Sequence, residues 1–411
     1  MGDHGGASVW DVTAARAEFP ALIPAPGRPR LSYLDSASST LRPRAVLDAL
    51  AYAHAHLTAG VHRGVYELSQ RSTDAYEDAR AKVARFFGAQ ASEIVFVRNT
   101  TEALNLVAQA WARPRLRAGD EIVITELEHH SNWLPWQAVA RFSGARLVVI
   151  PVDASGTVTM DAFAERIGAR TRVVALAHVS NVLGVELPVR EVVELAHAHG
   201  AVVVVDGAQA VPHLAVDVKA LGCDFYAASG HKVYGPSGAG VLFGRSERLA
   251  EMEPYQVGGG MVASVGAAGA TFLDPPQRFE AGTPDVASAI GLGAAVEYLR
   301  ACDRSALTTH ERRVLAYAER VKSVPGVRLL GSPRERVGVL SFVLDGVHPH
   351  DLGTVADTHG VAIRTGHHCA QPLLEKLGLG AAARLSVALY NDTDDIDALV
   401  DALHHARALF A

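Results

Sequence analysis

The apolar run Ala201-Val-Val-Val-Val-Asp206 decides the fold class of this chain. Four consecutive valines, without the alternation of a half-exposed strand, indicate a strand that is covered on both faces. A second strand is predicted within Cys223-Asp-Phe-Tyr-Ala-Ala-Ser-Gly-His-Lys232. Charged residues, Asp206 and Lys232, stand at or just past the ends of these strands. Because ligands of parallel sheets bind beyond the carboxyl ends of the strands, these two residues are the first candidates for function.

The alternation of short apolar strands with helical stretches extends outward from this run, from about residue 33 to residue 298. The other predicted strands are 93–97, 121–124, 146–150, 172–176 and 240–243. This order predicts the α/β class, with a mainly parallel, doubly wound sheet. We assign it to a large domain of residues 31–300.

A different pattern after about residue 300 predicts a smaller α+β domain, residues 301–411. Its predicted strands are 337–343, 361–364 and 384–390. The last helix carries aspartates at its positive end and an apolar face made of Ile396, Leu399, Val400, Leu403, Ala406 and Phe410. Residues 1–30 are expected to form an N-terminal arm that packs with this domain.

The stretch 254–284 is rich in glycine and alanine and shows little periodicity. Such a composition suits a flexible linker. A long segment of this kind inside a compact chain is more often functional, and we interpret it as a lid or as an arm to a neighbouring subunit.

Composition excludes several classes of protein. Of the 411 residues, 49% are hydrophobic and 20% are charged, as in an ordinary globular protein. The formal net charge is −6 and no block of like charge occurs, which argues against nucleic acid or an anionic membrane as a partner. The N-terminus does not resemble a signal peptide and no apolar run is long enough to span a bilayer, so we expect a cytoplasmic protein.

The three cysteines, Cys223, Cys302 and Cys369, are too few and too far apart for a disulfide framework. Cys369 stands among histidines, in Arg364-Thr-Gly-His-His-Cys-Ala-Gln-Pro372. A lone thiol in such surroundings is a candidate nucleophile, whereas the ordinary alternative is a buried, inert cysteine.

Polar side chains follow five of the predicted strands. Because the carboxyl ends of parallel strands lie along one edge of a sheet, these side chains are expected to converge on one crevice. They are Asn99, Thr100, Thr101, Glu128, His129, His130, Asn181, Asp206, Gln209, Ser229, His231 and Lys232.

The combination of Lys232 with Asp206 suits pyridoxal 5′-phosphate. A lysine amine can hold the aldehyde of this cofactor covalently, and a carboxylate can keep its ring nitrogen protonated. A carboxylate at the end of a buried strand needs a partner, because an unpaired buried charge is costly. The alternative is that Asp206 caps the following turn. Gln209 is placed to hydrogen-bond the ring oxygen of the cofactor.

The strand-to-helix turn at Thr100 and Thr101 is a candidate seat for the phosphate, because free backbone N–H groups and the helix dipole favour an anion. The alternative is ordinary N-capping by a threonine. Ser229 and His231 would add donors to the same phosphate. His129 would stack its imidazole on the flat ring and shuttle protons, whereas a solvated or core histidine is the ordinary alternative.

Motifs that would indicate other classes of enzyme are absent or stand in the wrong context. No Gly-x-x-x-x-Gly-Lys-Ser/Thr or Gly-x-Ser-x-Gly is present, and Gly291-Leu-Gly293 does not follow a strand as a dinucleotide fingerprint must. His367, His368 and Cys369 are consecutive, and neighbouring side chains of an extended segment point in opposite directions. They are therefore poorly placed to bind one zinc ion, and no residue is assigned to a metal.

A series of short motifs runs through nearly the whole chain, from Tyr33-Leu-Asp-Ser-Ala to the last helix. They are Val61-His-Arg-Gly64, Arg98-Asn-Thr-Thr-Glu-Ala103, Glu128-His-His-Ser-Asn132, His178-Val-Ser-Asn-Val-Leu-Gly184, Asp206-Gly-Ala-Gln-Ala210, Ser229-Gly-His-Lys232, Arg278-Phe-Glu-Ala-Gly-Thr-Pro284 and the segment around Cys369. In this order and spacing they resemble the group II cysteine desulfurases, the SufS-like branch of the class V aminotransferase family. The Gly-His-His-Cys part is the most specific for this branch.

The resemblance implies the fold type I architecture of pyridoxal-phosphate enzymes and a homodimer with its active sites at the interface. By motif, the cofactor is held by Lys232, Asp206, Gln209 and the stacking His129, and its phosphate by Thr101, Ser229, His231 and Thr283 of the other subunit. The substrate carboxylate is held by Asn181 and Arg384, with Arg364 beside them, and the sulfur-accepting nucleophile is Cys369. Two departures from the family pattern are visible, Tyr66 and Asp285, where histidine and asparagine are frequent.

These implications predict a cysteine desulfurase. L-cysteine would become L-alanine, and a persulfide on Cys369 would pass to a SufE- or SufU-like acceptor protein for iron–sulfur cluster assembly. Lys232 would remove the α-proton, His129 would return a proton to the product, and Arg364, His367 and His368 would favour the thiolate. The alternatives are a selenocysteine lyase, a sulfur-relay subunit without turnover, and an aminotransferase on the same fold.

Overall fold

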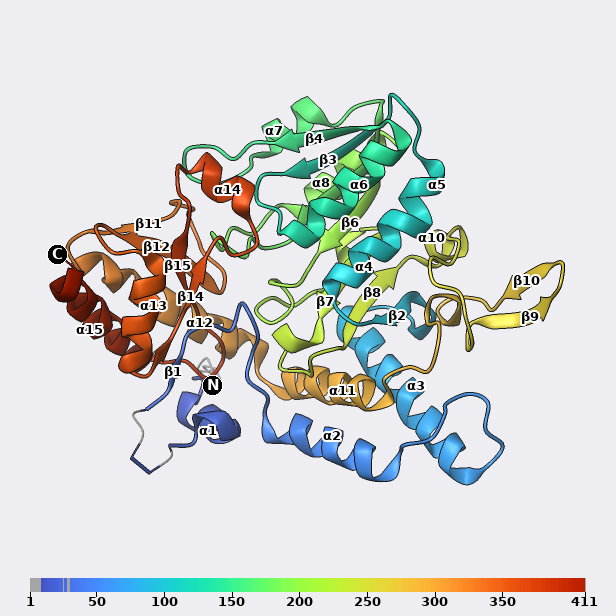
Figure 1. The fold of residues 1–411 in the computed structure, drawn as a ribbon, viewed down its shortest axis with the longest axis horizontal. Helices are drawn as coiled ribbons and strands as arrows, with labels where there is room; N and C mark the ends of the chain where they lie inside the picture. The colour runs from blue at the N-terminus through green and yellow to red at the C-terminus, as the bar shows by residue number, and fades with distance from the viewer. Residues whose placement is uncertain (1–8, 25, 28–29, 411) are drawn as a thin grey trace, which may run out of the picture.

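The structure is a computed structural model that describes residues 9–24, 26–27 and 30–410. The chain folds around a seven-stranded sheet (Figure 1). The order of its strands is β2-β8-β7-β6-β5-β3-β4. Their bounds are β2 Ile94–Val97, β3 Glu121–Thr125, β4 Arg146–Ile150, β5 Thr171–Ala177, β6 Val202–Asp206, β7 Phe225–Ser229 and β8 Gly240–Gly244. Each lies within two residues of a strand predicted from the sequence.

One strand of this sheet runs against the others. β8 pairs in antiparallel fashion with β7 on one side and with β2 on the other, whereas the remaining pairs are parallel. The prediction of a mainly parallel sheet is confirmed, with β8 as its exception.

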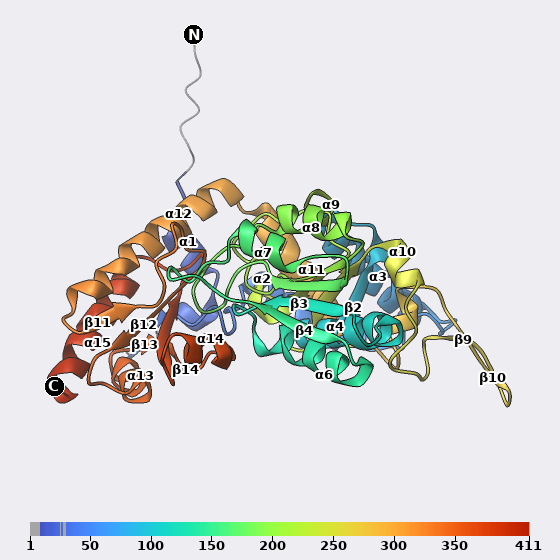
Figure 2. The same cartoon turned by 90° about the horizontal axis from the view of Figure 1, so that it is seen from above.

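Helices cover both faces of the sheet (Figure 2). Val203 and Val205 of β6 belong to one apolar cluster, while Val202 and Val204 belong to another on the opposite face. The valine run is therefore buried on both sides, as its lack of alternation predicts. The helices of the first cluster are α3 Glu67–Phe87, α7 Met160–Arg166, α8 Val189–Ala198, α9 Val218–Leu221 and α11 Val286–Ala301, and those of the second are α4 Thr100–Leu106, α6 Leu134–Ser143 and α10 Ser246–Ala250.

Further helical segments complete this part of the chain. A π-helical stretch, Val107–Ala112, carries α4 on toward α5, and α2 packs against α11. Their bounds are α2 Arg44–His56 and α5 Arg113–Arg115.

The C-terminal part contains a four-stranded antiparallel sheet in the order β11-β12-β15-β14. Its strands are β11 Val327–Leu329, β12 Val339–Leu344, β14 Arg364–Gly366 and β15 Ala382–Ser386. Three helices share its apolar core, namely α12 Arg304–Ala318, α13 Pro349–Thr358 and α15 Thr393–Phe410, and the short α14 Gln371–Lys376 follows the segment of Cys369.

Two expectations for this part are wrong in detail. The predicted strand 384–390 ends at Ser386, because the chain then turns into an aromatic cluster in which Tyr390 packs edge-on against Phe19 and Tyr234. Phe410 does not join the apolar face of α15. Its side chain is 47% exposed because it occupies the last turn of the helix, whereas the other predicted members of that face are buried.

The described N-terminal residues contact the C-terminal part. Trp10 Nε1 donates to the carbonyl of Leu389 at 2.8 Å, and Arg16 Nη1 donates to that of Tyr390 at 2.9 Å. The short strand β1, Ser32–Tyr33, pairs in parallel with β13, Val361–Ala362. Arg16 belongs to helix α1, Val12–Ala17. Of the expected arm, residues 1–30, the positions 1–8, 25, 28 and 29 lie outside the described residues. The division into domains stays a prediction.

The segment 254–284 has more structure than its composition predicts. It contains an antiparallel hairpin of β9, Val262–Gly266, and β10, Gly269–Phe272. Figure 2 shows this hairpin standing away from the rest of the molecule. Among the described residues, no helix is both long enough and apolar enough to cross a bilayer.

Candidate active site

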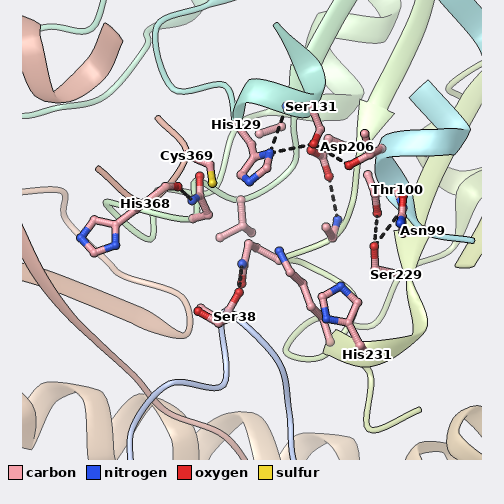
Figure 3. Close-up of a pocket in the computed structure, with 18 of the residues that line it drawn as sticks. Ser38, Asn99, Thr100, His129, Ser131, Asp206, Ser229, His231, His368 and Cys369 are labelled. Atoms are coloured by element: carbon pink, nitrogen blue, oxygen red, sulfur yellow. Dashed lines mark hydrogen bonds between the residues drawn. The ribbon is translucent and has the colours of Figure 1, made fainter. Parts of the chain in front are cut away.

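A cavity of about 230 Å³ lies where the carboxyl ends of the large sheet meet the C-terminal sheet and the segment after β1 (Figure 3). All five strand ends with polar groups reach it, as expected from the parallel topology. Of the predicted site residues, those that line the cavity are Thr100, Thr101, His129, Asn181, Asp206, Gln209, Ser229, His231, Lys232, Arg364, Cys369 and Arg384. Thr283 does not line it.

Lys232 and Asp206 come from neighbouring strands. Asp206 is the last residue of β6, and Lys232 ends the 3₁₀ turn Gly230–Lys232 that follows β7. Burial lowers the pKa of Lys232 to about 8, although the Asp206 charge opposes this shift. Burial also raises the pKa of Asp206, and the Ala208 N–H, which donates to its Oδ1 at 3.0 Å, opposes that shift. A buried carboxylate with one backbone hydrogen bond fits a cationic ring nitrogen as its partner.

The candidate phosphate seat lies at the start of α4. Asn99 caps this helix, since its Oδ1 accepts from the Glu102 N–H at 3.0 Å. Capping is therefore not the role of the threonines. Thr100 donates its N–H to Ser229 Oγ at 2.9 Å, and the two hydroxyl groups are 2.8 Å apart. These hydroxyls, with the N–H groups of the first turn, form a donor-rich surface that fits a phosphate group.

His129 presents a neutral ring to the cavity. Its Nδ1 accepts from the Ser131 N–H at 3.0 Å, so the ring proton sits on Nε2. Burial, and next the charge of Lys232, lower the pKa of His129 to about 3. A flat neutral ring fits stacking on a cofactor. The predicted return of a proton by His129 stays a prediction.

Two other cofactor candidates also have defined partners. Gln209 Nε2 donates to the carbonyl of Ala37 at 2.7 Å, which leaves its second amide hydrogen for a ring oxygen. Burial, and next the charge of Lys232, lower the pKa of His231 to about 4, so its imidazole ring is also neutral at neutral pH.

Arg384 is a buried cation on β15. Its Nη1 donates to the carbonyl of Asn181 at 2.9 Å, and its Nη2 donates to Asp35 Oδ1 at 3.2 Å and Ser38 Oγ at 3.0 Å. Its Nε is buried and has no hydrogen-bond partner. Burial lowers the pKa of Arg384 to about 10, with Asp35 opposing the shift, so the guanidinium stays charged at neutral pH. An unpartnered donor on a buried cation fits a carboxylate ligand.

Cys369 lies on a strained turn that the large sheet holds in place. His368 and Cys369 both have positive φ, 53° and 55°, a conformation that is uncommon for residues other than glycine. The His130 N–H donates to the Cys369 carbonyl at 2.7 Å, and Asn181 Nδ2 donates to the His368 carbonyl at 2.7 Å. Cys369 is half-buried and lines the cavity, as Figure 3 shows, so its thiol can reach a bound ligand.

His368 differs from the expectation that it favours a thiolate as a cation. Its Nε2 donates to the Ala382 carbonyl at 3.1 Å, and its Nδ1 is buried without a partner. Burial, and next the charge of Arg384, lower the pKa of His368 to about 3. The ring is neutral at working pH, so Arg364 is the cation of this segment that lines the cavity.

The family is decided by comparison with known proteins. The family model for class-V aminotransferases matches residues 32–399. The chain belongs to this family.

Relatives within the class V family cover almost the whole chain. A cysteine desulfurase of Dickeya dadantii is 49% identical over 403 residues, which are 97% of this chain and 98% of the relative. A probable cysteine desulfurase 1 of Mycobacterium leprae is 46% identical over 401 residues, but this chain spans 66% of that relative's length, just under two thirds. The crystal structure of the cysteine desulfurase CsdA (S-sulfonic acid) from Escherichia coli has a TM-score of 0.91 at 42% identity, covering 98% of this chain and 100% of that chain. The predicted family and fold class are confirmed.

Thr283 lines two other cavities, of about 360 and 470 Å³. Tyr66, one of the two departures from the class V pattern noted in the sequence, lines the larger of them. The other departure, Asp285, caps α11 by accepting from the Ser288 N–H at 2.9 Å and hydroxyl at 2.6 Å. Within one chain, Thr283 is therefore separate from the other predicted cofactor residues, and its assignment to the site of a second subunit stays a prediction.

Sequence reasoning missed three residues beside or in the cavity. Ser131 accompanies His129, and its Oγ lies 2.7 Å from Thr101 Oγ1. Asp35 and Ser38 bind the guanidinium of Arg384. Ser131 and Asp35 were within reach of sequence reasoning, because each lies in one of the family motifs. Ser38 follows a two-residue strand whose pairing with β13 has no signal in the local pattern. In the described ranges, no group of three or more His, Cys, Asp or Glu side chains is arranged to hold a metal ion.

Proposed function

We propose that this chain is a pyridoxal-phosphate-dependent cysteine desulfurase that converts L-cysteine to L-alanine and collects the sulfur as a persulfide on Cys369. The proposal rests mainly on one observation: Lys232, Asp206 and Cys369, whose thiol lies on a strained turn, line the same cavity. The first two suit the cofactor, and the thiol has no evident use in an aminotransferase. Relatives that carry the desulfurase name at 45–49% identity support this choice.

Pyridoxal phosphate, when bound, supplies a sink for the electrons of the substrate's α-carbon. Lys232 would bind its aldehyde, Asp206 its ring nitrogen and Gln209 its ring oxygen, while His129 would lie against its ring. Thr100, Thr101, Ser229 and His231 would hold its phosphate, with Thr283 added from a second subunit. The donor-rich turn and the buried carboxylate fit this group, as described above.

The substrate carboxylate would bind to Arg384, with Arg364 and Asn181 beside it. A guanidinium offers a planar fork of donors that matches a carboxylate. The burial of Arg384, which is 2% exposed, strengthens this interaction because water competes weakly there. The amino acid would thereby be oriented with its sulfur toward Cys369.

Lys232 would transfer the α-proton of the substrate. With a pKa of about 8, a free amine at this position is partly neutral near pH 7–8 and can remove the α-proton as a base. The same group can return a proton to the product. This assignment is offered beside the proton transfer from His129 that the sequence suggested, because burial lowers the pKa of that ring.

The thiolate of Cys369 would attack the sulfur of L-cysteine. A sulfur–sulfur bond forms, the carbon–sulfur bond of the substrate breaks, and its electron pair stays on the substrate carbon, which then takes a proton to give L-alanine. The thiol of the enzyme and the thiol of the substrate thus become one persulfide and one C–H bond, so no outside oxidant is needed.

The persulfide would pass to an acceptor protein of the SufE or SufU kind, for use in iron–sulfur cluster assembly. The half-burial of Cys369 supports release of its sulfur to a partner. We further propose a homodimer. Large apolar side chains just before and in the first turn of α3, Val65, Tyr66 and Leu68, are exposed beside the larger cavity that Thr283 lines, which is typical of an interaction surface. The cytoplasmic location stays a prediction.

The test measures alanine release from L-cysteine with native protein and with single variants. Lys232→Ala is expected to abolish both alanine release and the absorbance of protein-bound cofactor. Cys369→Ser is expected to retain the absorbance and to lose alanine release from L-cysteine. Cys302→Ser is the matched control, because that thiol bonds to the Tyr298 carbonyl and does not line the cavity.

Native rates of alanine release from L-cysteine by Cys369→Ser would contradict the assignment of the nucleophile. Poor turnover of L-cysteine by the native protein, beside selenocysteine turnover that Cys369→Ser leaves unchanged, would favour a selenocysteine lyase instead.

A further inference from the structure

The hydroxyl of Ser38 joins the two guanidiniums of the cavity. Its Oγ accepts from Arg364 Nη1 at 3.1 Å and from Arg384 Nη2 at 3.0 Å, and it donates to Asp35 Oδ1 at 2.7 Å. A serine hydroxyl has one hydrogen and two lone pairs, so these three bonds use its full capacity. Figure 3 shows Ser38 at the edge of the cavity with one of these bonds drawn.

Ser38 holds together two charges that would otherwise repel. Arg364 on β14 and Arg384 on β15 are direct cross-strand neighbours, and like charges in such positions destabilise a sheet. Asp35 contributes one negative charge, 3.2 Å from Arg384 Nη2. Two guanidiniums and one carboxylate leave one net positive charge, which matches the single α-carboxylate of an amino acid.

The three hydrogen bonds also fix the direction of the donors that remain free. Arg384 is bound at Nη1 and Nη2, while its buried Nε has no partner. Within the described part of the chain, Ser38 is the hydrogen-bond partner of the Arg364 guanidinium. Loss of the hydroxyl would free Arg364 to turn toward water, because a long side chain gains entropy when it is released.

We propose that Ser38 is a positioning residue that presets Arg364 and Arg384 as one clamp for the substrate's α-carboxylate. This inference rests on the proposed function, in which these arginines bind that group. Ser38 acts through the arginines, and Asp35 accepts the hydrogen bond of its hydroxyl and balances the second charge.

The test compares the binding of L-alanine, which carries the carboxylate, with that of ethylamine, which lacks it. Both are titrated into holoenzyme, and the absorbance of the bound cofactor is followed. Ser38→Ala is expected to weaken L-alanine binding about tenfold, because a hydrogen bond to a charged group is lost, and to leave ethylamine binding within about twofold. Ser38→Thr, which keeps a hydroxyl, is expected to restore most of the L-alanine affinity.

Kinetics give a second readout. Ser38→Ala is expected to raise KM for L-cysteine by about tenfold while kcat changes less than about threefold, since binding is lost equally in the ground and transition states. Ser39→Ala is the matched control. It removes a hydroxyl from the same turn, and that hydroxyl donates to the His231 carbonyl at 3.2 Å and contacts neither arginine.

Equal weakening of both ligands in Ser38→Ala would show a general structural role and overturn the inference, as would unchanged L-alanine binding. The proposed desulfurase activity and the inference about Ser38 can be refuted separately. A native protein that releases no alanine from L-cysteine refutes the desulfurase, yet its L-alanine titration still tests the clamp. If native protein is active and Ser38→Ala binds L-alanine normally, the inference about Ser38 alone is refuted.

Discussion

Glu128 shows how one buried residue couples the stability of the fold to pH. Its side chain is 1% exposed, and it accepts from Thr125 Oγ1 at 2.7 Å and Asn132 Nδ2 at 2.6 Å. Burial raises its pKa to about 8, although both hydrogen bonds oppose the shift. The folded protein therefore keeps a proton on Glu128 over a range in which an unfolded glutamate, with a pKa near 4.5, has lost it.

The stabilising effect of this proton is present in full below about pH 4.5 and is lost as pH rises toward 8, because unfolding then releases a proton. Glu128→Gln stays neutral at every pH. We therefore expect this variant to gain stability relative to the native protein as pH rises from 5 to 8, by roughly 1 kcal/mol per pH unit. The measurement is the free energy of unfolding in denaturant at several pH values. Parallel curves for the two proteins would contradict the prediction.

At the residue scale, the sequence predicted which side chains meet but not their protonation or their partners. Asp206, Lys232 and Ser229 could be placed because they follow buried strands, and parallel strands bring their ends together. The neutral state of His129 could not be predicted, since it comes from burial by segments distant in the chain. The contact of Ser38 with Arg384 joins residues 346 positions apart, so no local pattern encodes it.

At the scale of elements, strands whose apolar sequence has one dominant cause, burial on both faces, were predicted well. β6 consists of valines before its final aspartate and was found within one residue, because burial on both faces leaves a continuous apolar run. The hairpin β9–β10 was not predicted. Glycine, alanine and serine make up much of the pair and most of its residues are exposed, so no alternation of buried and exposed side chains marks it as a strand pair.

The cap of α11 permits a prediction at this scale. Asp285 accepts from both the N–H and the hydroxyl of Ser288, and α11 packs against α2 and α3. Asp285→Ala is expected to lower the free energy of unfolding by about 1 kcal/mol, whereas Asp285→Asn, which can still accept a bond, should lose less. Denaturant unfolding measures both. Asp274→Ala is the control, because that side chain is 99% exposed and lies outside α11. An equal loss in Asp285→Ala and Asp274→Ala would contradict a capping role.

At the scale of the whole molecule, the candidate site depends on three parts of the chain that the sequence does not visibly connect. The large sheet supplies Asp206 and Lys232, the C-terminal sheet supplies Arg384, and the segment after β1 supplies Ser38. β1 reaches its place by pairing with β13, and Tyr390 packs into an aromatic cluster with Phe19. The alternation of strands and helices predicts the two sheets, but the way they meet is set by such long-range packing.

The place of Thr283 leads to a prediction about assembly. In one chain it lines cavities separate from that of Lys232, so its proposed contact with a phosphate requires the site of a second subunit. Thr283→Ala alone is expected to weaken cofactor binding by about tenfold, because a hydrogen bond to an anion is lost. The native protein is expected to sediment as a dimer, as is Thr283→Ala.

A mixture of two inactive or weakened subunits then distinguishes a site shared between subunits from a site within one. In a mixed dimer of Lys232→Ala with Thr283→Ala, the subunit with Thr283→Ala keeps its own Lys232 and receives an intact Thr283 from its neighbour. One of the two sites is then native, and half of the mixed dimer's sites should bind cofactor with native affinity and release alanine. If Thr283 served its own chain, no site of the mixed dimer would be native. Remixed subunits whose cofactor affinity stays at the level of Thr283→Ala would therefore contradict the shared site, provided that sedimentation confirms that mixed dimers have formed.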